Sequence, residues 1–193
     1  MGSIGKAQLT GGVLAGGRSS RFGSNKAMQV FQGKTFLQRD IDLLEALCAE
    51  VMISSSKENA WNYSDLGKAV IPDVYSDSGP LAGIYSMLIH CKTPYMLVLT
   101  CDMPAMSEAV LKQMTQHPGK DAVCWQFPNG TLSPFPMLVC KNCLPALKES
   151  LDAQQLQVKK FLMRVETLLL EITKDEEIYF SNINTIEDLN TLS

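Results

Sequence analysis

Short apolar runs alternate with amphipathic stretches along the first 126 residues, and this rhythm constrains the fold more than any other feature. Apolar runs of strand length cover residues 8–14, 50–53, 68–71, 95–100 and 122–126. Helical spacing or helix-start residues mark 35–47, 81–90 and 107–115. Strands that alternate with helices predict a layered α/β fold whose sheet is mainly parallel. The run from Tyr95 to Thr100 has no polar alternation, which is typical of a central strand covered on both faces.

The remainder of the chain is less regular. It predicts a strand at 132–139, helices at 143–151 and 158–165, short strands at 168–172 and 178–180, and a last helix at 185–192. Thr185 is the expected N-cap of that last helix, with Asp188 completing a capping box. A length of 193 residues with 46% hydrophobic residues fits one domain with its own core.

Composition excludes several classes of protein. The net charge of -3 provides no broad basic field, so nucleic acid is not expected as a partner. No apolar run approaches the roughly 20 residues that a membrane-spanning helix needs, and the first residues lack a signal-peptide stretch. A cytoplasmic protein is therefore expected.

The six cysteines are scattered rather than grouped for metal binding. One CxxC pair, Cys140 and Cys143, lacks the second pair or the histidine pair that a zinc site needs, since the chain has only His90 and His117. The expected role is that of reduced, structural thiols rather than metal or redox chemistry.

A glycine-rich segment follows the first predicted strand, from Leu14 and Ala15 to Lys26. Gly16-Gly17 allows backbone amides to approach an anion without obstruction by Cβ atoms. The segment adds three cations, Arg18, Arg21 and Lys26, and Ser19 and Ser20 add hydroxyl donors. It matches neither the P-loop nor the GxGxxG pattern. A plain glycine turn with a solvated basic loop is the alternative, but three clustered cations favour phosphate binding.

Three more polar segments stand directly after predicted strands or near the C-terminal end. Asp102 follows the most apolar strand, where carboxylates commonly hold Mg²⁺. Asp73 follows another strand and precedes Gly79-Pro80-Leu81-Ala82-Gly83, whose glycines would let a helix N-terminus approach a flat ligand. Asn182 and Asn184 point the same way if the segment is extended. Each segment taken alone could also be a turn or a helix cap.

Together these segments resemble the MobA family of molybdenum cofactor guanylyltransferases. The matching motifs are Leu14-Ala15-Gly16-Gly17, Arg21-Phe22-Gly23, Lys26, Asp73, Gly79-Pro80-Leu81-Ala82-Gly83, Asp102-Met103-Pro104 and Asn182-Ile183-Asn184-Thr185. Their order and spacing match along nearly the whole chain. The first motif is common to many nucleotidyltransferases, whereas the final Asn-x-Asn-Thr in a chain this short is typical of MobA-like proteins.

The resemblance implies a three-layer α/β/α Rossmann-like nucleotidyltransferase fold and Mg²⁺-dependent transfer of GMP from GTP to molybdopterin that carries molybdenum. Residues 1–126 would form the nucleotide-binding half and 127–193 the acceptor half of one domain. Molybdoenzyme maturation proteins would be further partners.

The resemblance also assigns roles to residues. Lys26, Arg21 and Asp102 would act in catalysis, and Asp102 would bind the metal. The nucleotide and the pterin would be held by Leu14, Ala15, Gly16, Gly17, Lys26, Asp73, Gly79, Gly83, Asn182 and Asn184.

The chain departs from the family pattern at a few positions. Phe22 replaces Met, Ile186 replaces Pro, and Asn25 stands where the family usually has Asp before the lysine. Ser54-Ser55-Ser56 stands where family members tend to carry an Asn that helps read the base. Three alternatives therefore stay open: a related enzyme that uses CTP or another acceptor, a nucleotide-binding module that has lost catalysis, and a Rossmann-like domain whose loops merely turn.

Basic residues in the second half of the chain are a further candidate feature. Lys159, Lys160 and Arg164 could bind an anionic acceptor, but a solvated helix face is the favoured interpretation.

Overall fold

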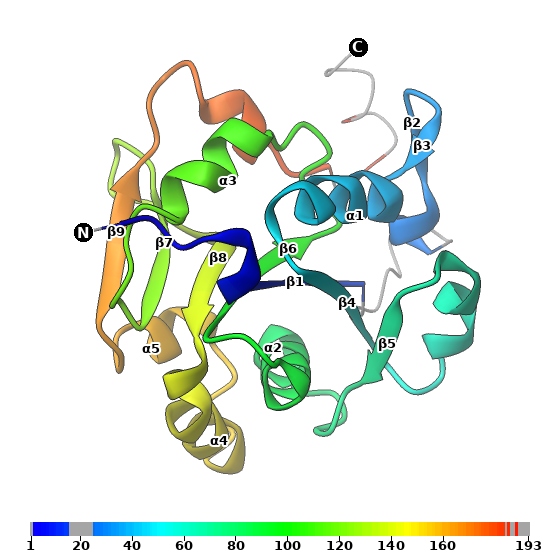
Figure 1. Cartoon of the computed structure of the whole chain (residues 1–193), viewed down its shortest axis with the longest axis horizontal. Helices are drawn as coiled ribbons and strands as arrows, with labels where there is room; N and C mark the ends of the chain where they lie inside the picture. The colour runs from blue at the N-terminus through cyan, green and yellow to red at the C-terminus, as the bar shows by residue number, and fades with distance from the viewer. Residues whose placement is uncertain (1, 16–24, 184, 186–187, 189–193) are drawn as a thin grey trace.

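One sheet of seven strands runs through the molecule, in a computed structural model that describes residues 2–15, 25–183, 185 and 188 (Figure 1). Its strand order is β5-β4-β1-β6-β8-β7-β9. The strands are β1 (Leu9–Leu14), β4 (Glu50–Ser55), β5 (Ala69–Pro72), β6 (Tyr95–Thr100), β7 (Ala122–Gln126), β8 (Leu132–Cys140) and β9 (Thr167–Glu171). A separate hairpin joins β2 (Val30–Phe31) to β3 (Lys34–Thr35).

The sheet is mainly parallel, as predicted. β5, β4, β1 and β6 run parallel to one another, and β9 runs parallel to β7. Only β8 is antiparallel to its neighbours β6 and β7. Four neighbouring strands therefore end at the same edge of the sheet, which is where ligands bind in open α/β folds.

Helices cover both faces of the sheet, which confirms the three-layer architecture (Figure 1). One face carries α1 (Phe36–Leu47) and α3 (Glu108–Met114), and the other carries α2 (Gly79–His90), α4 (Leu144–Asp152) and α5 (Val158–Leu162). Ser107 caps α3 as predicted, because its hydroxyl accepts a hydrogen bond from the Val110 amide. Thr35 caps α1 in the same way through Gln38.

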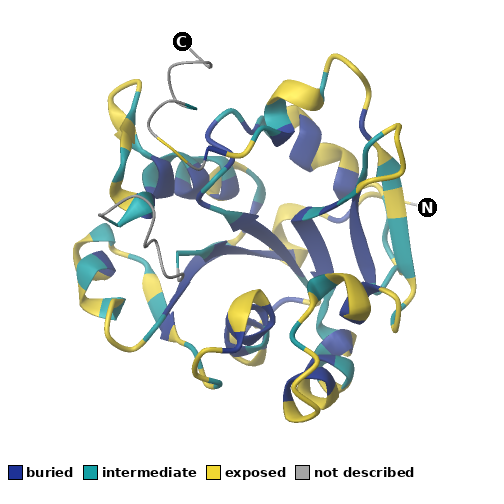
Figure 2. Ribbon diagram, turned by 180° about the vertical axis from the view of Figure 1, so that it is seen from behind, coloured by how far each residue is buried: buried dark blue, intermediate teal, exposed yellow. Residues whose placement is uncertain are grey.

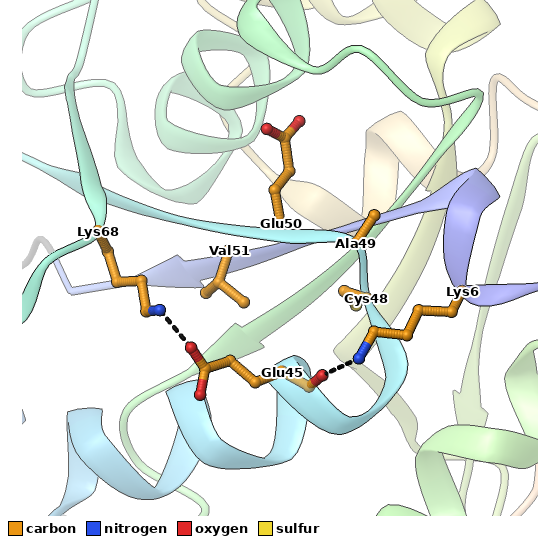
Figure 3. Close-up of a pocket in the computed structure, with 7 residues that line it drawn as sticks. All are labelled: Lys6, Glu45, Cys48, Ala49, Glu50, Val51 and Lys68. Carbon is orange, nitrogen blue, oxygen red and sulfur yellow. Dashed lines mark hydrogen bonds and ion pairs between the residues drawn. The ribbon is translucent and has the colours of Figure 1, made fainter.

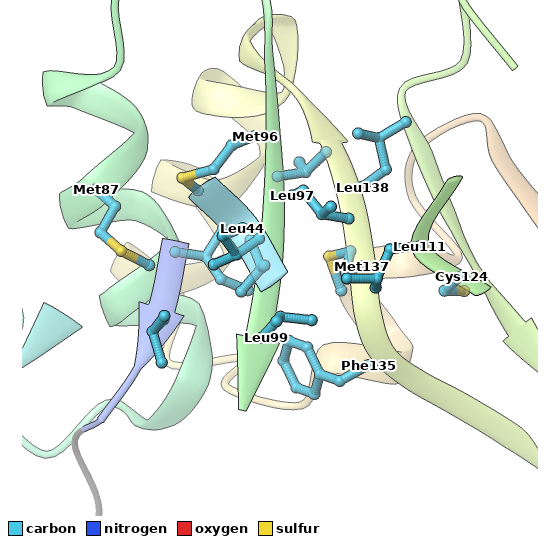
Figure 4. Packing of buried hydrophobic residues seen from close by; sticks show 14 of the residues in the cluster. Leu44, Met87, Met96, Leu97, Leu99, Leu111, Cys124, Phe135, Met137 and Leu138 are labelled. Atoms are coloured by element: carbon cyan, nitrogen blue, oxygen red, sulfur yellow. The ribbon is translucent and has the colours of Figure 1, made fainter. Parts of the chain in front are cut away.

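The core lies on both sides of the parallel strands (Figures 2 and 4). Leu97 and Val98 of β6 are fully buried, as expected for a strand covered on both faces. β1 contributes two glycines instead of large side chains. Gly11 faces Leu44 of α1 and Gly12 faces Met87 of α2, so one helix can approach β1 closely from each side.

One predicted strand is wrong. Residues 178–180 belong to η5, a 3₁₀ turn over Glu177–Phe180. The Glu176 carboxylate accepts hydrogen bonds from the amide and the hydroxyl of Thr173, which closes a turn directly after β9. Phe180 then packs against Trp125 and Phe127, with ring centroids 5.1 and 6.1 Å away. Aromatic burial, rather than pairing with another strand, therefore explains this apolar segment.

Other boundaries differ from the prediction because tertiary packing set them. α5 ends at Leu162 rather than at residue 165, and β2, β3 and η3 (Ala60–Leu66) were not predicted. The capping box is confirmed, since the amide of Thr185 donates to Asp188 Oδ2 and the Asp188 amide donates to Thr185 Oγ1. The rest of the predicted last helix lies outside the described residues. Among the described residues no helix has the length and apolar character needed to cross a membrane.

Candidate functional site

The carboxyl ends of β1, β4 and β5 are joined by hydrogen bonds into one polar surface. The Ala15 amide donates to the Ser54 carbonyl (3.0 Å), and the Asp73 amide donates to the Ser55 carbonyl (3.1 Å). Ser54 Oγ donates to Asp73 Oδ1 at 2.6 Å. Two predicted site residues, Ala15 and Asp73, therefore lie at the same sheet edge and are connected through β4.

Asp73 is half-buried, and its environment affects its charge. Burial raises the pKa of this carboxyl, and the hydrogen bond from Ser54 opposes that rise. The serine at position 54 thus has a definite structural role: it orients the carboxylate and favours its ionised form.

Asp102 lies in a tight turn at the end of β6. Its amide donates to the Thr100 carbonyl (2.8 Å), and Thr100 Oγ1 donates to Asp102 Oδ1 (2.5 Å). The Asp102 carbonyl accepts from the amide of Ile183, a buried residue (2.8 Å). That bond fixes the C-terminal segment against the β6 turn and brings Asn182, which is exposed, to the site.

Lys26 opens η2 (Lys26–Met28) and is half-buried. Burial lowers the pKa of its ammonium group, while the charges of Asp102, Cys101 and Asp188 oppose the decrease. The fold therefore brings Lys26 within electrostatic reach of Asp102 and of Asp188, although about 76 residues separate Lys26 from Asp102 in sequence.

Asn25 caps η2. Its Oδ1 accepts from the Ala27 amide (3.2 Å) and its Nδ2 donates to the hydroxyl of Tyr63 (2.9 Å). The sequence pattern showed Asn25 as a departure from the family but did not indicate that Tyr63 is its partner.

The N-terminal part of α2 has two glycines with different roles. Gly79 adopts a positive φ of 64°, and a Cβ atom there would meet nothing within 4 Å. A Cβ at Gly83 would lie 2.5 Å from Ser54 Oγ and 2.6 Å from Leu14 Cδ2. Gly83 is thus required for packing of α2 against the ends of β1 and β4, next to the residue that holds Asp73.

A buried carboxyl that sequence reasoning missed lies beneath the β6 turn. Asp40 of α1 is 3% exposed, and the thiol of Cys101, also buried, is among the groups that affect its pKa. Burial raises its pKa well above the usual range. A polar residue on the apolar face of α1 was the only available signal.

The basic residues considered as candidates for binding an anionic acceptor lie on the solvated surface, the interpretation that the sequence favoured. Lys159 and Lys160 are exposed on α5. Arg164 donates to Glu149 (2.8 Å) and to Ser150 Oγ (2.9 Å) of α4. Through these hydrogen bonds the guanidinium group of Arg164 joins the segment after α5 to α4.

The cysteines are free thiols, and five of the six are buried. The Cys143 thiol donates to the Asp121 carbonyl, and burial raises its pKa to about 12. Cys143 therefore packs inside the fold, whereas Cys140 is half-buried.

A cavity of about 270 Å³ lies at the amino end of β4, remote from these groups (Figure 3). Both lysines that line the cavity contact Glu45 of α1. The Glu45 carbonyl accepts a hydrogen bond from Lys6 Nζ (2.6 Å), and the Glu45 carboxylate forms an ion pair with Lys68. The cavity is lined by one ion pair and one lysine–carbonyl hydrogen bond, and by none of the predicted site residues.

Four predicted site residues, Gly16, Gly17, Arg21 and Asn184, lie outside the described part of the chain. The structure brings the others, Leu14, Ala15, Lys26, Asp73, Gly79, Gly83, Asp102 and Asn182, to the carboxyl edge of the parallel strands or to the loops and helix that border it.

Comparison with known proteins gives a consistent result. A protein of Flavobacterium johnsoniae named "Probable molybdenum cofactor guanylyltransferase" is 33% identical over 187 residues, which cover 96% of each chain. The "Molybdenum cofactor guanylyltransferase" of Bordetella petrii is 29% identical and covers 98% of this chain and 99% of its own. In structure, the chain is similar to molybdopterin-guanine dinucleotide biosynthesis protein A of Archaeoglobus fulgidus, with a TM-score of 0.80, 22% identity, and coverage of 94% of this chain and 95% of that chain.

The structural likeness confirms the Rossmann-like nucleotidyltransferase fold. The family model for the MobA-like NTP transferase domain matches residues 11–168. This span begins within β1 and includes most of the sheet, Asp73, α2 and Asp102. The chain therefore belongs to the MobA-like NTP transferases, a family of nucleotidyltransferase enzymes.

Proposed function

We propose that the protein transfers GMP from GTP to the terminal phosphate of molybdopterin carrying molybdenum, with release of pyrophosphate. The observation that carries the proposal is that the charge of Asp102, at the carboxyl end of β6, acts on the half-buried ammonium group of Lys26. A cation beside a carboxylate at this edge suits a triphosphate and its metal ion. The names of relatives such as the Flavobacterium johnsoniae protein support guanylyl transfer to the molybdenum cofactor.

The nucleotide would lie across the ends of β1, β4 and β5. Leu14, Ala15, Gly16 and Gly17 would contact it through the backbone, and the oriented carboxylate of Asp73 would accept a hydrogen bond from it. Gly79 leaves open space at the start of α2, which supports close approach of the nucleotide there.

The acceptor would approach from the side of the C-terminal segment. The bond between Ile183 and Asp102 holds Asn182 next to the β6 turn, which supports a role for Asn182 and Asn184 in binding the pterin or its phosphate. Residues 127–193 would thus serve the acceptor and the first 126 residues the nucleotide, in a protein acting in the cytoplasm.

Magnesium fits the residues at the site. Among the described residues no three His, Cys, Asp or Glu side chains cluster into a protein-only metal site. Mg²⁺ commonly uses one or two carboxylates together with substrate phosphates, so Asp102, held by Thr100, is a suitable ligand. When bound, Mg²⁺ would neutralise phosphate charge.

The reaction needs positioning more than covalent chemistry. An oxygen of the terminal pterin phosphate attacks the α-phosphorus of GTP, and the bond from that phosphorus to the bridging oxygen breaks in line. The attacking phosphate is already an anion, so no general base has to remove a proton. Lys26 and Arg21 would neutralise the charge that develops on the leaving pyrophosphate.

The proposal is tested by binding and turnover. Lys26→Ala should weaken GTP binding by about 1.5–3 kcal/mol, because one charge-assisted contact is lost. Lys159→Ala, which removes an exposed lysine on α5, is the matched control and should bind GTP as the unmodified protein does. Equal affinity in Lys26→Ala would refute the assignment of the loop.

Turnover separates an enzyme from a binding module. Release of pyrophosphate from GTP should require molybdopterin and should be lost in Asp102→Asn, which keeps the shape of the side chain but removes its charge. Binding of GTP without any pyrophosphate release in the unmodified protein would instead favour a module that has lost catalysis.

A further inference from the structure

A buried tyrosine hydroxyl joins the two described residues that flank the glycine-rich motif. Tyr63 of η3 is 1% exposed, and its hydroxyl donates to the Ala15 carbonyl at 3.0 Å. The same hydroxyl accepts from Asn25 Nδ2 at 2.9 Å. Asn25 Oδ1 accepts from the Ala27 amide and is a second, longer acceptor for the Tyr63 hydroxyl, at 3.2 Å. Ala15 and Asn25 are thus connected through a side chain nearly forty residues further along the chain.

The shorter hydrogen bonds of this hydroxyl, to the Ala15 carbonyl and from Asn25 Nδ2, favour an amide at position 25. A phenol has one proton, and when it is donated to Ala15 the oxygen can only accept from its second partner. The amide of Asn25 supplies that donor and still has an oxygen for the Ala27 amide. An ionised carboxylate has no donor, so it would draw the phenol proton away from the Ala15 carbonyl. The contact with Tyr63 therefore suits Asn better than Asp before the lysine.

These contacts extend to the residues proposed to bind the triphosphate. Asn25 is the N-cap of η2, and Lys26 is the first residue of that turn. On the other side, the Ala15 amide is held by the Ser54 carbonyl, and Ser54 holds Asp73. We propose that Tyr63 and Asn25 form a clasp that positions Ala15 and Lys26 for a nucleoside triphosphate, an inference that rests on the proposed function for its ligand.

The hydrogen bonds of the clasp persist at neutral pH because the Tyr63 hydroxyl stays protonated. Burial raises the pKa of the Tyr63 phenol, and the hydrogen bond from Asn25 partly opposes this rise. The hydroxyl therefore keeps the proton that it donates to Ala15. Tyr63 does not touch the reacting atoms, so its role is one of positioning.

Tyr63→Phe tests the clasp, because it removes the hydroxyl and keeps the buried ring. The loss of one buried hydrogen bond should raise the Kd and the KM for GTP about 3- to 10-fold and leave the KM for molybdopterin unchanged. Tyr95→Phe is the matched control: its hydroxyl accepts from the Gly119 amide at 2.8 Å, and the residue opens β6 at the opposite edge of the sheet. The control should leave the Kd for GTP unchanged even if both variants lower the melting temperature.

A double-mutant cycle with Asn25→Ala tests whether the two residues act as a unit. The double variant should bind GTP no more weakly than the worse single variant, since either change alone opens the clasp. Additive losses would overturn the inference, as would an unchanged Kd in Tyr63→Phe. If Tyr63→Phe fails to fold, Asn25→Ala alone should still raise the Kd for GTP.

Hydrogen exchange separates failure of the clasp from failure of the proposed function. Exchange of the Ala27 amide should accelerate in Tyr63→Phe without any nucleotide present, because the Asn25 cap is released. Suppose that exchange of the Ala27 amide is faster in Tyr63→Phe but the unmodified protein binds no triphosphate. This result would overturn the proposed function and the role of the clasp in ligand binding, and would support only the hydrogen-bonded geometry of the clasp. Unchanged exchange would overturn the clasp itself.

Discussion

Two aspartates on the same helix, Asp40 and Asp42 of α1, show how position decides what a carboxyl does. Asp40 is buried, and its Oδ2 has no hydrogen-bond partner within the described chain. Asp42 receives hydrogen bonds from Lys34 (2.6 Å) and Gln38 (2.8 Å). Burial raises the pKa of Asp40 well above its usual range. For Asp42 a smaller burial effect is outweighed by these two hydrogen bonds, and the pKa is lowered.

We predict that Asp40 makes the protein less stable as the pH rises. The folded state holds the Asp40 proton more tightly than the unfolded chain does. The free energy of unfolding therefore decreases as the pH rises from 3.8, the ordinary pKa of an aspartate, towards the folded pKa. At its steepest this single group contributes about 1.4 kcal/mol per pH unit. Asp40→Asn should flatten that dependence in urea titrations between pH 4 and 8, carried out with a chelator and without nucleotide.

Asp42→Asn provides the control with the opposite sign. The lowered pKa of Asp42 stabilises the folded state above pH 3.8, and this contribution disappears as the pH falls through the folded pKa. Its removal should therefore reduce stability at neutral pH and have no effect in acid. A pH dependence in Asp40→Asn as steep as in the unmodified protein would show that another group causes it.

At the scale of elements, two neighbouring glycines of β1 each face a different helix at close range. A Cβ at Gly11 would lie 2.8 Å from Leu44 Cβ, an atom fixed by the backbone of α1. A Cβ at Gly12 would lie 2.9 Å from Met87 Cε, the end of a flexible side chain on α2. The two faces of β1 thus differ in how easily they can adjust.

We predict that Gly11→Ala destabilises the protein more than Gly12→Ala. Overpacking costs typically about 1–3 kcal/mol, and the larger value belongs to Gly11 because α1 itself must move. Urea unfolding of both variants measures the difference. Equal losses would mean that α1 shifts as readily as the Met87 side chain.

At the scale of the whole molecule, the melting temperature measured with different nucleoside triphosphates should show which base the protein binds. A nucleotide that binds only the folded state stabilises it by about 2.7 kcal/mol at one hundred times its Kd. For a chain of this length that corresponds to a rise in melting temperature of roughly 5–10 °C. GTP with Mg²⁺ should produce the shift, whereas CTP and ATP at equal concentration should not. A shift with CTP alone would refute the guanylyl assignment and favour a cytidylyl enzyme.

The order of strands in the sheet decides which residues meet, and only part of this could be predicted. Asp73 and Asp102 each follow a strand, and the carboxyl ends of parallel strands lie at the same edge of a sheet. Their shared location could therefore be predicted from the sequence. The contact of Ile183 with Asp102 could not be predicted, because it depends on how the C-terminal segment returns past β7 and β9. Such returns are set by long-range packing, which local patterns do not encode.

The layered α/β class, most strands and helices, and the motif residues of a MobA-like transferase follow from local patterns in the chain. Periodicity, caps and residues after strands are local signals. Three features appear only once the chain is folded: Tyr63 contacts Ala15 and Asn25, Gly83 makes room for Ser54, and Asp40 is buried below the β6 turn. Each of these depends on contacts between residues far apart in the chain, where hydrogen-bond direction and close packing act only after the sheet has assembled.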